Sequence, residues 1–401
     1  MTIETLASLP KIDPSAIAEH YKSFRVTQRQ LLTGHSHQAW PDVAFNGQQQ
    51  AWQDAADFVD SKWKLAFQKA AKVKLYFARL LDDPAVDDVA NNYTLASNTH
   101  DLLLRFLSAL DWKKGKQIIT TDGEFHSMRR QLSRLQEEGV EVICVPVSPS
   151  ETLTERMSNE ITDKTIGIMM SAVMFKNSNI IPHLKLIAEA ANNKHIPFLV
   201  DAYHATNVVP FTIKENGLEQ AFVLGGGYKY CQFGEGNCFI RIPPDCDSRP
   251  IITGWFAEFG DIEKGLDPNI TQYPSGGDRF QGSTYDTTSH YRACSVIDFF
   301  ESQSLTIERL RALSQHQIGL LRSSFDALDC NPKLITRANV QLNQIGGFLS
   351  LKTSEAPRIQ KALMDVDVWT DQRDGYLRFG PAPYLSDKQI TDAILALGEI
   401  I

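Results

Sequence analysis

Residues 197–204 read PFLVDAYH, and residues 225–230 read GGGYKY. The first stretch opens with an apolar run that lacks polar–apolar alternation, as is typical of a strand covered on both faces. Similar apolar runs recur along the chain and are separated by helical patterns. The predicted strands are 117–121, 140–146, 166–172, 198–201, 221–224 and 238–242, and the predicted helices are 101–110, 127–138, 183–193 and 218–220. This alternation predicts an α/β fold with a large, mostly parallel sheet and helices on both faces.

The length of the chain predicts more than one domain. With 401 residues and 43% hydrophobic content, the chain is too long for one typical core. We expect an N-terminal arm at 1–50 that packs with the small domain, a large domain at 51–285, and a smaller C-terminal α+β domain at 286–401.

Helical patterns flank the sheet region on both sides. Residues 51–81 read as a helix, and residues 289–328 read as a long helical stretch that is broken near 302–304. Short strands are predicted at 348–352 and 376–379. The apolar stripe predicted for the first helix consists of Trp52, Ala56, Val59, Trp63 and Phe67.

Charge and cysteine content exclude several classes of partner. The formal net charge is -8, which argues against a nucleic acid or an anionic membrane as partner. No run is long and apolar enough for a membrane span, and the first residues do not resemble a signal peptide. The six cysteines are scattered without a CxxC pair, so we expect reduced thiols, no metal site and a cytoplasmic protein.

The two quoted stretches carry the residues with the clearest chemistry. Asp201 ends an apolar run, so its carboxylate is predicted at the carboxyl edge of a parallel strand, where ligands bind in open α/β sheets. Lys229 follows another strand and three glycines, which let the backbone approach a ligand closely. A carboxylate there can hold a protonated pyridine nitrogen, and a lysine there can form an imine with an aldehyde. Either residue alone is typical of a strand-end acid or a solvated loop lysine, but the pair, with His204, predicts a pyridoxal-type site.

Other residues suit the remainder of such a site. Asn98 and Thr99 precede a predicted helix, whose N-terminus can cradle a phosphate, although ordinary capping is the alternative. Phe125 follows the strand at 117–121, where its ring can stack on a planar cofactor or pack as an ordinary core residue. Arg378 lies near the C-terminus, and arginine is a natural bidentate partner for an α-carboxylate.

At this point the chain resembles the class-V, fold-type-I group of pyridoxal-phosphate enzymes, and within it kynureninase. The motifs that carry the resemblance are Asp201-x-x-His204, Tyr228-Lys229-Tyr230 and Gly254-Trp255-Phe256. The resemblance implies a large, mostly parallel seven-stranded sheet domain, a smaller C-terminal α+β domain, and pyridoxal 5'-phosphate held as a Schiff base. The implied catalytic residues are Lys229, Asp201 and Tyr228. The implied cofactor-binding residues are Lys229, Asp201, His204, Asn98, Thr99, Phe125, Tyr228, Trp255 and Thr284, and the implied substrate-binding residues are Arg378, Ser36 and His35.

The resemblance also implies a reaction and an assembly. The reaction is hydrolysis of the Cβ–Cγ bond of L-kynurenine or 3-hydroxykynurenine, which gives an anthranilate and L-alanine and belongs to tryptophan catabolism. The assembly is a homodimer with shared active sites, because Trp255 and Thr284 would then complete the site of the neighbouring subunit.

Departures from the kynureninase pattern leave other reactions open. The sequence differs from that pattern at His35, His37, Ala257 and Thr284, on the side of the pocket that would hold the aryl ketone. A class-V aminotransferase or C–S lyase acting on a different small amino acid is the alternative. A cysteine desulfurase needs a mobile nucleophilic cysteine shortly before the terminal arginine, and residues 340–360 contain no cysteine. A non-catalytic protein of the same fold is a third possibility, against which the intact Asp201, His204 and Lys229 argue.

Overall fold

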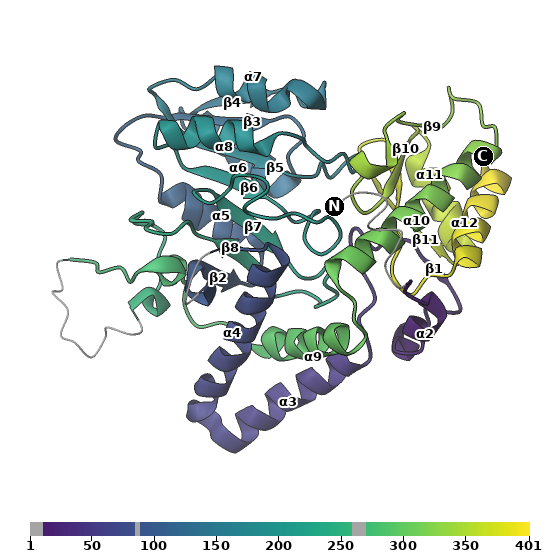
Figure 1. The fold of residues 1–401 in the computed structure, drawn as a ribbon, viewed down its shortest axis with the longest axis horizontal. Coiled ribbons are helices and arrows are strands. Elements are labelled where there is room, and N and C mark those ends of the chain that lie inside the picture. The colour runs from purple at the N-terminus through teal and green to yellow at the C-terminus, as the bar shows by residue number, and fades with distance from the viewer. Residues whose placement is uncertain (1–10, 85–88, 259–269) are drawn as a thin grey trace.

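A computed structural model describes residues 11–84, 89–258 and 270–401. Within these residues, the centre is a seven-stranded sheet with strand order β2-β8-β7-β6-β5-β3-β4 (Figure 1). Its strands are β2 (Tyr93–Ala96), β3 (Gln117–Thr121), β4 (Glu141–Val145), β5 (Thr165–Ser171), β6 (Phe198–Asp201), β7 (Phe222–Gly226) and β8 (Cys238–Arg241). Strand β8 pairs antiparallel with both of its neighbours, and the strands from β7 to β4 pair in parallel. The predicted α/β fold with a large, mostly parallel sheet is therefore confirmed.

Helices cover both faces of this sheet. The helices are α4 (Trp63–Leu80), α5 (Thr99–Ser108), α6 (His126–Glu137), α7 (Leu153–Asn159) and α8 (Leu184–Asn193). Because side chains alternate along a strand, Leu199 of β6 packs with the buried residues of α5 and α6, while its neighbours Phe198 and Val200 pack with those of α4, α7 and α8. The parallel strands are thus buried on both sides, which explains why their sequences lack alternation.

The C-terminal part forms a second, smaller α+β unit. It contains α10 (Ile307–Ala327), β9 (Thr336–Arg337), β10 (Leu349–Lys352), α11 (Ala356–Asp365), β11 (Val368–Trp369), β12 (Asp371–Arg373), β13 (Tyr376–Phe379) and α12 (Asp387–Ile400). Four of its strands form an antiparallel sheet in the order β12-β13-β10-β9. The N-terminal segment reaches this unit, because β1 (Gln30–Leu31) pairs with β11 and α2 (Pro14–Ala18) lies nearby in Figure 1. The domain boundaries at 50 and 285 stay a prediction.

Two helix predictions are wrong. The predicted helix at 218–220 is a turn, because Gly217 has a left-handed backbone (φ +64°) and the segment is too short to sustain helical hydrogen bonds. The predicted single helix at 51–81 is two helices, α3 (Val43–Phe58) and α4, separated at Val59, whose φ is +46°. The expected apolar stripe is interrupted there, since the side chains of Trp52 and Val59 are exposed.

Other elements lie close to their predicted positions. The long helical stretch divides into α9 (Thr288–Ser302) and α10, with the break where it was expected. Helix α9 lies beside α3 at the base of the molecule in Figure 1. Strand β2 and helix α7 were not predicted, because each is short.

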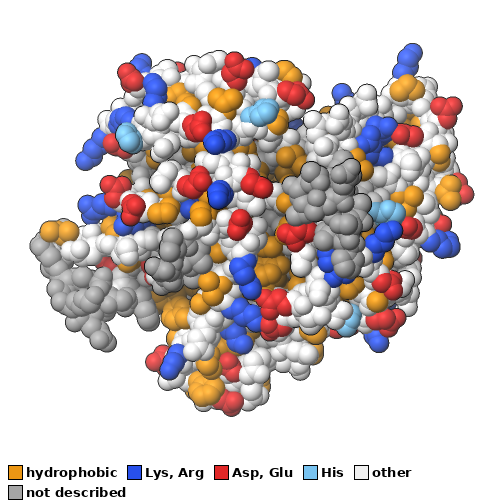
Figure 2. Space-filling model, viewed as in Figure 1, with side chains coloured by type: hydrophobic (Ala, Val, Ile, Leu, Met, Phe, Trp, Pro, Cys, Tyr) orange, Lys and Arg blue, Asp and Glu red, His pale blue; other side chains and the backbone are white. Residues whose placement is uncertain are grey.

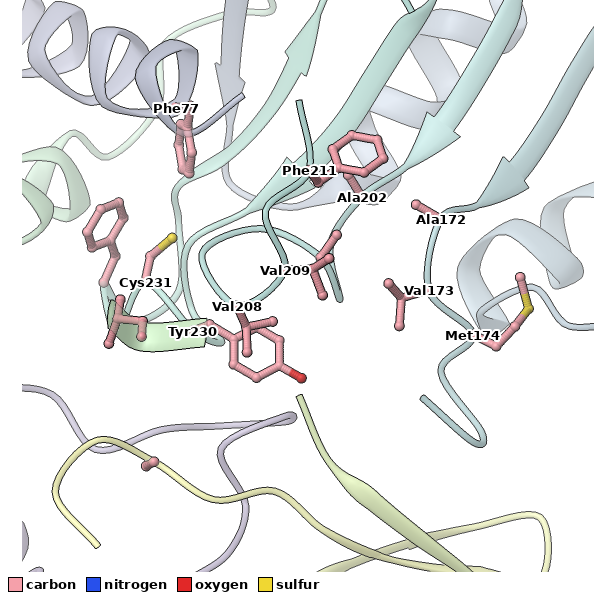
Figure 3. Packing of buried hydrophobic residues seen from close by; sticks show 14 of the residues in the cluster. Phe77, Ala172, Val173, Met174, Ala202, Val208, Val209, Phe211, Tyr230 and Cys231 are labelled. Carbon is pink, nitrogen blue, oxygen red and sulfur yellow. The ribbon is translucent and has the colours of Figure 1, made fainter. Parts of the chain in front are cut away.

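The core continues from the sheet into the loops that follow its strands. Figure 3 shows Ala172, Val173 and Met174 after β5, and Val208 and Val209 after β6, among the buried apolar residues of one cluster. These loops are therefore held by packing as well as by hydrogen bonds. On the face seen in Figure 2, Lys and Arg side chains are interspersed with Asp and Glu side chains. In the described part of the chain, no helix combines the length and the apolar character of a bilayer span.

Candidate active site

Most of the predicted site residues lie at one edge of the large sheet. Asp201 is the last residue of β6, Lys229 follows β7, Phe125 follows β3 and Asn98 follows β2. Since β2, β3, β6 and β7 run in the same direction, their carboxyl ends meet at that edge. Cys238 of β8 pairs with both Ala96 and Gly226, which brings the ends of β2 and β7 to either side of it.

Lys229 is buried, and its amine lies among polar and aromatic groups. Its Nζ atom is 2.7 Å from Nε2 of His204 and 4.9 Å from the centre of the Tyr203 ring. Burial lowers the pKa of Lys229 to about 7, and the positive charge of Arg378 adds to this effect, while Asp201 opposes it. Burial also lowers the pKa of His204 well below its usual value, so that its ring is neutral and its Nε2 can accept a hydrogen bond from the amine. With such a pKa, about half of the amine is neutral at pH 7, and the neutral form is a competent nucleophile.

Two carboxyl groups lie near the carboxyl ends of β6 and β3: the half-buried Asp201 at the end of β6, and the buried Glu124 in the turn after β3. Asp201 Oδ1 accepts a hydrogen bond from the backbone N–H of Tyr203 (2.9 Å), and burial raises the pKa of Asp201 despite that bond and the nearby Lys229. Glu124 accepts hydrogen bonds from the hydroxyls of Thr121 and Ser171 (both 2.6 Å), and burial raises its pKa to about 7. Ser171 is the register partner of Asp201 across β5 and β6, so the two acids belong to one network.

Aromatic rings form the walls around the amine of Lys229. The Phe125 ring centre is 5.8 Å from Nζ, and this ring meets Phe175 edge-on at 5.5 Å. The Tyr228 ring lies between Tyr203 (5.0 Å) and His37, on which it stacks at 5.1 Å. Burial raises the pKa of Tyr228, so its phenol stays protonated at neutral pH. The amine of Lys229 thus lies among flat rings, which are suited to stack on or border a planar ligand.

The three glycines before Lys229 have no room for side chains. A Cβ atom at Gly225 would lie 2.7 Å from the Phe239 ring, and one at Gly227 would lie 2.4 Å from the Phe233 ring. A Cβ atom at Gly226 would lie 2.5 Å from the Tyr203 hydroxyl. The glycine run is therefore required by close packing at the floor of the site.

Arg378 is buried and already paired in the small unit. Its Nη2 donates to Asp371 Oδ2 (2.6 Å), and its Nη1 donates to the backbone carbonyl of Phe175 (2.5 Å). His35 is fully buried, with its ring 4.4 Å from the Phe348 ring and its Nε2 3.7 Å from Asp371 Oδ2. The ring of Phe348 also lies 5.5 Å from the Arg378 guanidinium and 5.6 Å from the His204 ring. Phe348 thus links the Arg378 cluster to the Lys229 cluster.

The remaining predicted residues lie outside this cluster. Trp255 and Thr284 are exposed and bond to each other, with Trp255 Nε1 donating to Thr284 Oγ1 (3.2 Å). The structure therefore brings these two predicted residues together. Ser36 is half-buried in a turn, where its N–H donates to the Thr33 carbonyl (2.8 Å).

Asn98 is the N-cap of α5. Its Oδ1 accepts from the N–H of Asp101 (2.9 Å), so Thr99 is the first helical residue, two positions before the predicted start. The first backbone N–H groups of a helix have no partner within it. Asn98 can therefore cap the helix while the helix N-terminus binds a phosphate, because the side chain of Asn98 satisfies only one of these N–H donors.

Sequence reasoning missed several residues of the cluster: Tyr203, Glu124, Phe348 and Asp371. Two of them had a local signal, because Tyr203 lies inside the quoted DAYH stretch and Glu124 directly precedes Phe125. Phe348 and Asp371 had none, since they reach the site only through the pairing of β10, β12 and β13.

Comparisons with known proteins bear on this geometry. Residues 95–231 match the family described as aminotransferase class-V. The uncharacterized aminotransferase YcbU of Bacillus subtilis (strain 168) is 24% identical over 250 residues, which cover 62% of this chain and 63% of that protein. The cysteine desulfurase IscS of Clostridium botulinum (strain Kyoto / Type A2) is 32% identical over 36% of each chain. The mitochondrial cysteine desulfurase of Arthroderma benhamiae (strain ATCC MYA-4681 / CBS 112371) is 30% identical, over 71% of this chain and 56% of that protein. The matches thus span less than two thirds of each of these relatives.

Solved structures resemble the whole chain. The complex between the cystine C–S lyase C-DES and its reaction product cysteine persulfide has a TM-score of 0.81 at 17% identity, over 95% of this chain and 99% of that chain. The apo cysteine desulfurase of Thermococcus onnurineus NA1 has a TM-score of 0.78 at 14% identity, over 98% of each chain. At these identities the likeness shows the fold alone, which is fold type I of the pyridoxal-phosphate enzymes.

The fold defines a fold-type-I protein with a candidate site at the carboxyl edge of its sheet. The sequence matches support the class-V aminotransferase family, and with the structural neighbours they indicate pyridoxal 5'-phosphate as the cofactor.

The residues present fit this cofactor. The buried Lys229 amine lies among aromatic rings, and the half-buried Asp201 ends the adjoining strand β6. Among the described residues, buried polar atoms without a hydrogen-bond partner gather here, namely His204 Nδ1, Tyr230 Oη, Arg378 Nε and both ring nitrogens of His35. Unsatisfied buried donors and acceptors of this kind are expected where a polar ligand belongs.

Proposed function

We propose that this protein is a pyridoxal-phosphate-dependent C–S lyase that acts on a small sulfur-containing amino acid, with cystine and cysteine as the leading candidates. The sequence relatives named above include cysteine desulfurases, and one structural neighbour is a cystine C–S lyase. These comparisons favour the C–S lyase alternative over kynureninase-type hydrolysis. A class-V aminotransferase is the second candidate, supported by the family match and by the likeness to YcbU.

The placement of the cysteines favours a lyase over a desulfurase. Cys231, Cys238 and Cys294 are buried, and burial raises the pKa of each thiol. The thiolate is the nucleophilic form, so a buried thiol with a raised pKa is a poor sulfur acceptor. Cys144 is exposed on β4, the strand at the far edge of the sheet from β7. A reaction in which sulfur leaves with the product needs no enzyme thiol.

The residues of the cluster have distinct roles in this proposal. When bound, pyridoxal phosphate supplies an electron sink for the electron pair released at Cα of the amino acid. Lys229 holds the cofactor covalently, and its Nζ, neutral near pH 7, accepts the Cα proton. Asp201 keeps the proton on the ring nitrogen of the cofactor. Arg378 binds the α-carboxylate of the substrate.

Release of sulfur requires an acid on the other side of the substrate. The phenol of Tyr228 stays protonated at neutral pH, and its ring centre is 5.8 Å from Lys229 Nζ. It is therefore the candidate donor to the departing sulfur. For cystine, cleavage of one Cβ–S bond followed by addition of water gives cysteine persulfide, pyruvate and ammonia.

The dimer with shared active sites stays a prediction. Trp255 and Thr284 are exposed, as expected of side chains that face a neighbouring subunit. In the proposed dimer this pair serves the cofactor of the partner.

The substrate class is tested by the products. We expect the purified holoenzyme to release pyruvate and ammonia from L-cystine or L-cysteine, with persulfide detected from cystine. L-Kynurenine should give no fluorescent anthranilate, and L-alanine with a keto acid should give no amino transfer. Anthranilate release without pyruvate would restore the kynureninase hypothesis, and conversion of the cofactor to its amine form would favour the aminotransferase.

The protonation of Lys229 predicts a pH dependence for cofactor capture. Because only the neutral amine attacks an aldehyde, the rate at which the apoenzyme captures pyridoxal phosphate should rise about tenfold per pH unit below pH 7 and level off above it. Arg378 lowers the pKa of Lys229, so Arg378→Gln should move the midpoint to higher pH. Stopped-flow absorbance of the apoenzyme measures both profiles. A wild-type midpoint near 10 would contradict the buried, neutral amine.

A further inference from the structure

The guanidinium of Arg378 already holds a carboxylate from its own chain. Asp371 and Arg378 face each other across β12 and β13 as register partners, and Asp371 Oδ2 lies 2.6 Å from Arg378 Nη2. Both side chains are buried, at 8% and 5% exposure. A buried ion pair of this geometry is fully formed before any substrate arrives.

The other nitrogens of Arg378 differ in what they can offer a ligand. Nη1 donates to the Phe175 carbonyl at 2.5 Å, so this nitrogen is engaged by the large sheet unit. Nε is buried and has no hydrogen-bond partner among the described residues. A guanidinium carries five N–H donors, and these contacts occupy one on Nη1 and one on Nη2. A substrate carboxylate that bonds to Arg378 must therefore use the remaining donors and share the guanidinium with Asp371, or displace that side chain.

Asp371 has a second cation on its other side. Its Oδ1 lies 3.3 Å from Nη1 of Arg373, whose side chain is about half exposed. The nearby His35 ring offers no hydrogen bond at 3.7 Å. Asp371 can thus loosen its bond to Arg378 and keep a compensating charge on Arg373.

We infer that Asp371 sets the affinity of the site for amino acids by competing with the substrate α-carboxylate for Arg378. This inference rests on the proposed function, in which an amino acid binds through Arg378. Asp371 is a specificity-determining residue here, because its negative charge weakens every ligand that carries a carboxylate at that place and leaves simple amines unaffected. Two carboxylates on one buried guanidinium repel each other strongly, since the surroundings screen charge poorly.

The test uses Asp371→Asn in the holoenzyme, with L-alanine and ethylamine as probes. Neither probe has a sulfur to lose, and they differ by one carboxylate. Asparagine keeps an oxygen for Arg378 Nη2 and removes only the charge. We expect the dissociation constant of L-alanine, read from the change in the cofactor absorbance, to fall about tenfold, and that of ethylamine to stay within about twofold.

Asp374→Asn is the matched control, because Asp374 lies in the turn that joins the same two strands and pairs with the partly exposed Lys176 (3.0 Å). It loses the same charge and should leave both dissociation constants within about twofold. Thermal unfolding of each variant shows that it is folded, and Asp371→Ser replaces the asparagine variant if that one is not.

The outcomes separate the inference from the function on which it rests. An L-alanine dissociation constant that is unchanged or higher in the folded Asp371 variant overturns the inference, because a purely structural aspartate would loosen Arg378 and weaken binding. Equal tightening of L-alanine and ethylamine overturns it as well. If the wild-type enzyme responds to neither probe, the proposed amino-acid function fails instead.

Discussion

Replacement of Lys229 by alanine is expected to abolish covalent capture of pyridoxal phosphate and to lower turnover by about 10⁴-fold, the upper range for loss of a positioned acid–base group. The amine is buried and held 2.7 Å from His204, and no other lysine is described in contact with that histidine. Borohydride reduction of the loaded enzyme followed by peptide mapping measures the attachment. The wild type should carry a pyridoxyl group on Lys229, and the variant should carry none.

Lys176→Ala is the matched control for this experiment. The Lys176 amine lies 5.8 Å from the centre of the Phe175 ring and pairs with Asp374. Its side chain is partly exposed and does not belong to the cluster around Lys229. Its loss should leave the label on Lys229 and turnover within about threefold, as is usual for an exposed ion pair. A label on any lysine other than Lys229 would remove the basis of the proposed function.

The largest effect on stability is expected at a buried ion pair far from the chemistry. Arg241 in β8 contacts Asp83 twice, through Nε (3.0 Å) and Nη2 (3.2 Å), and both side chains are almost fully buried. Its Nη1 also donates to the carbonyls of Leu218, Glu219 and Ala221. Arg241→Ala leaves a buried carboxylate and three carbonyls without this donor, so the free energy of unfolding should fall by about 3–5 kcal/mol.

Arg79→Ala provides the comparison for Arg241→Ala. Arg79 pairs with Glu301 at 2.9 Å, but both side chains are at least half exposed, so the loss should be below about 1 kcal/mol. Urea unfolding of the two apoenzymes, followed by fluorescence, measures the difference. Arg241→Met combined with Asp83→Leu should recover much of the lost stability, because it removes both buried charges. Equal losses for Arg241→Ala and Arg79→Ala would show that the pair around Arg241 contributes little.

The sequence predicted the parts of the site that depend on short segments. A strand that ends at Asp201, and a strand that ends in the glycine run shortly before Lys229, place both side chains at the same edge of a parallel sheet. Hydrophobic runs locate such strands within a few residues, because each run must be buried on both faces. The cofactor side of the pocket could therefore be derived from the sequence, and the cofactor itself is supported by the family match.

The substrate side could not be derived in the same way. Asp371 meets Arg378 only because β12 and β13 pair in one register, and Phe348 reaches His35 from a separate segment. No local pattern encodes such contacts, since they depend on long-range packing. The same limit explains the preference for kynureninase, which rested on short motifs around the cofactor, whereas the relatives named above include cysteine desulfurases.

The close packing around the glycines at 225–227 limits which positions can be varied to change the substrate specificity of this enzyme. A single methyl group at position 225, 226 or 227 would collide with a ring or a hydroxyl below it, so libraries that vary these positions should yield almost only inactive clones. A more adaptable position is His37 of the N-terminal segment, which is largely exposed and stacks on Tyr228. Evolution of new specificities in the laboratory is therefore expected to proceed through the N-terminal segment, while the glycines at 225, 226 and 227 stay fixed.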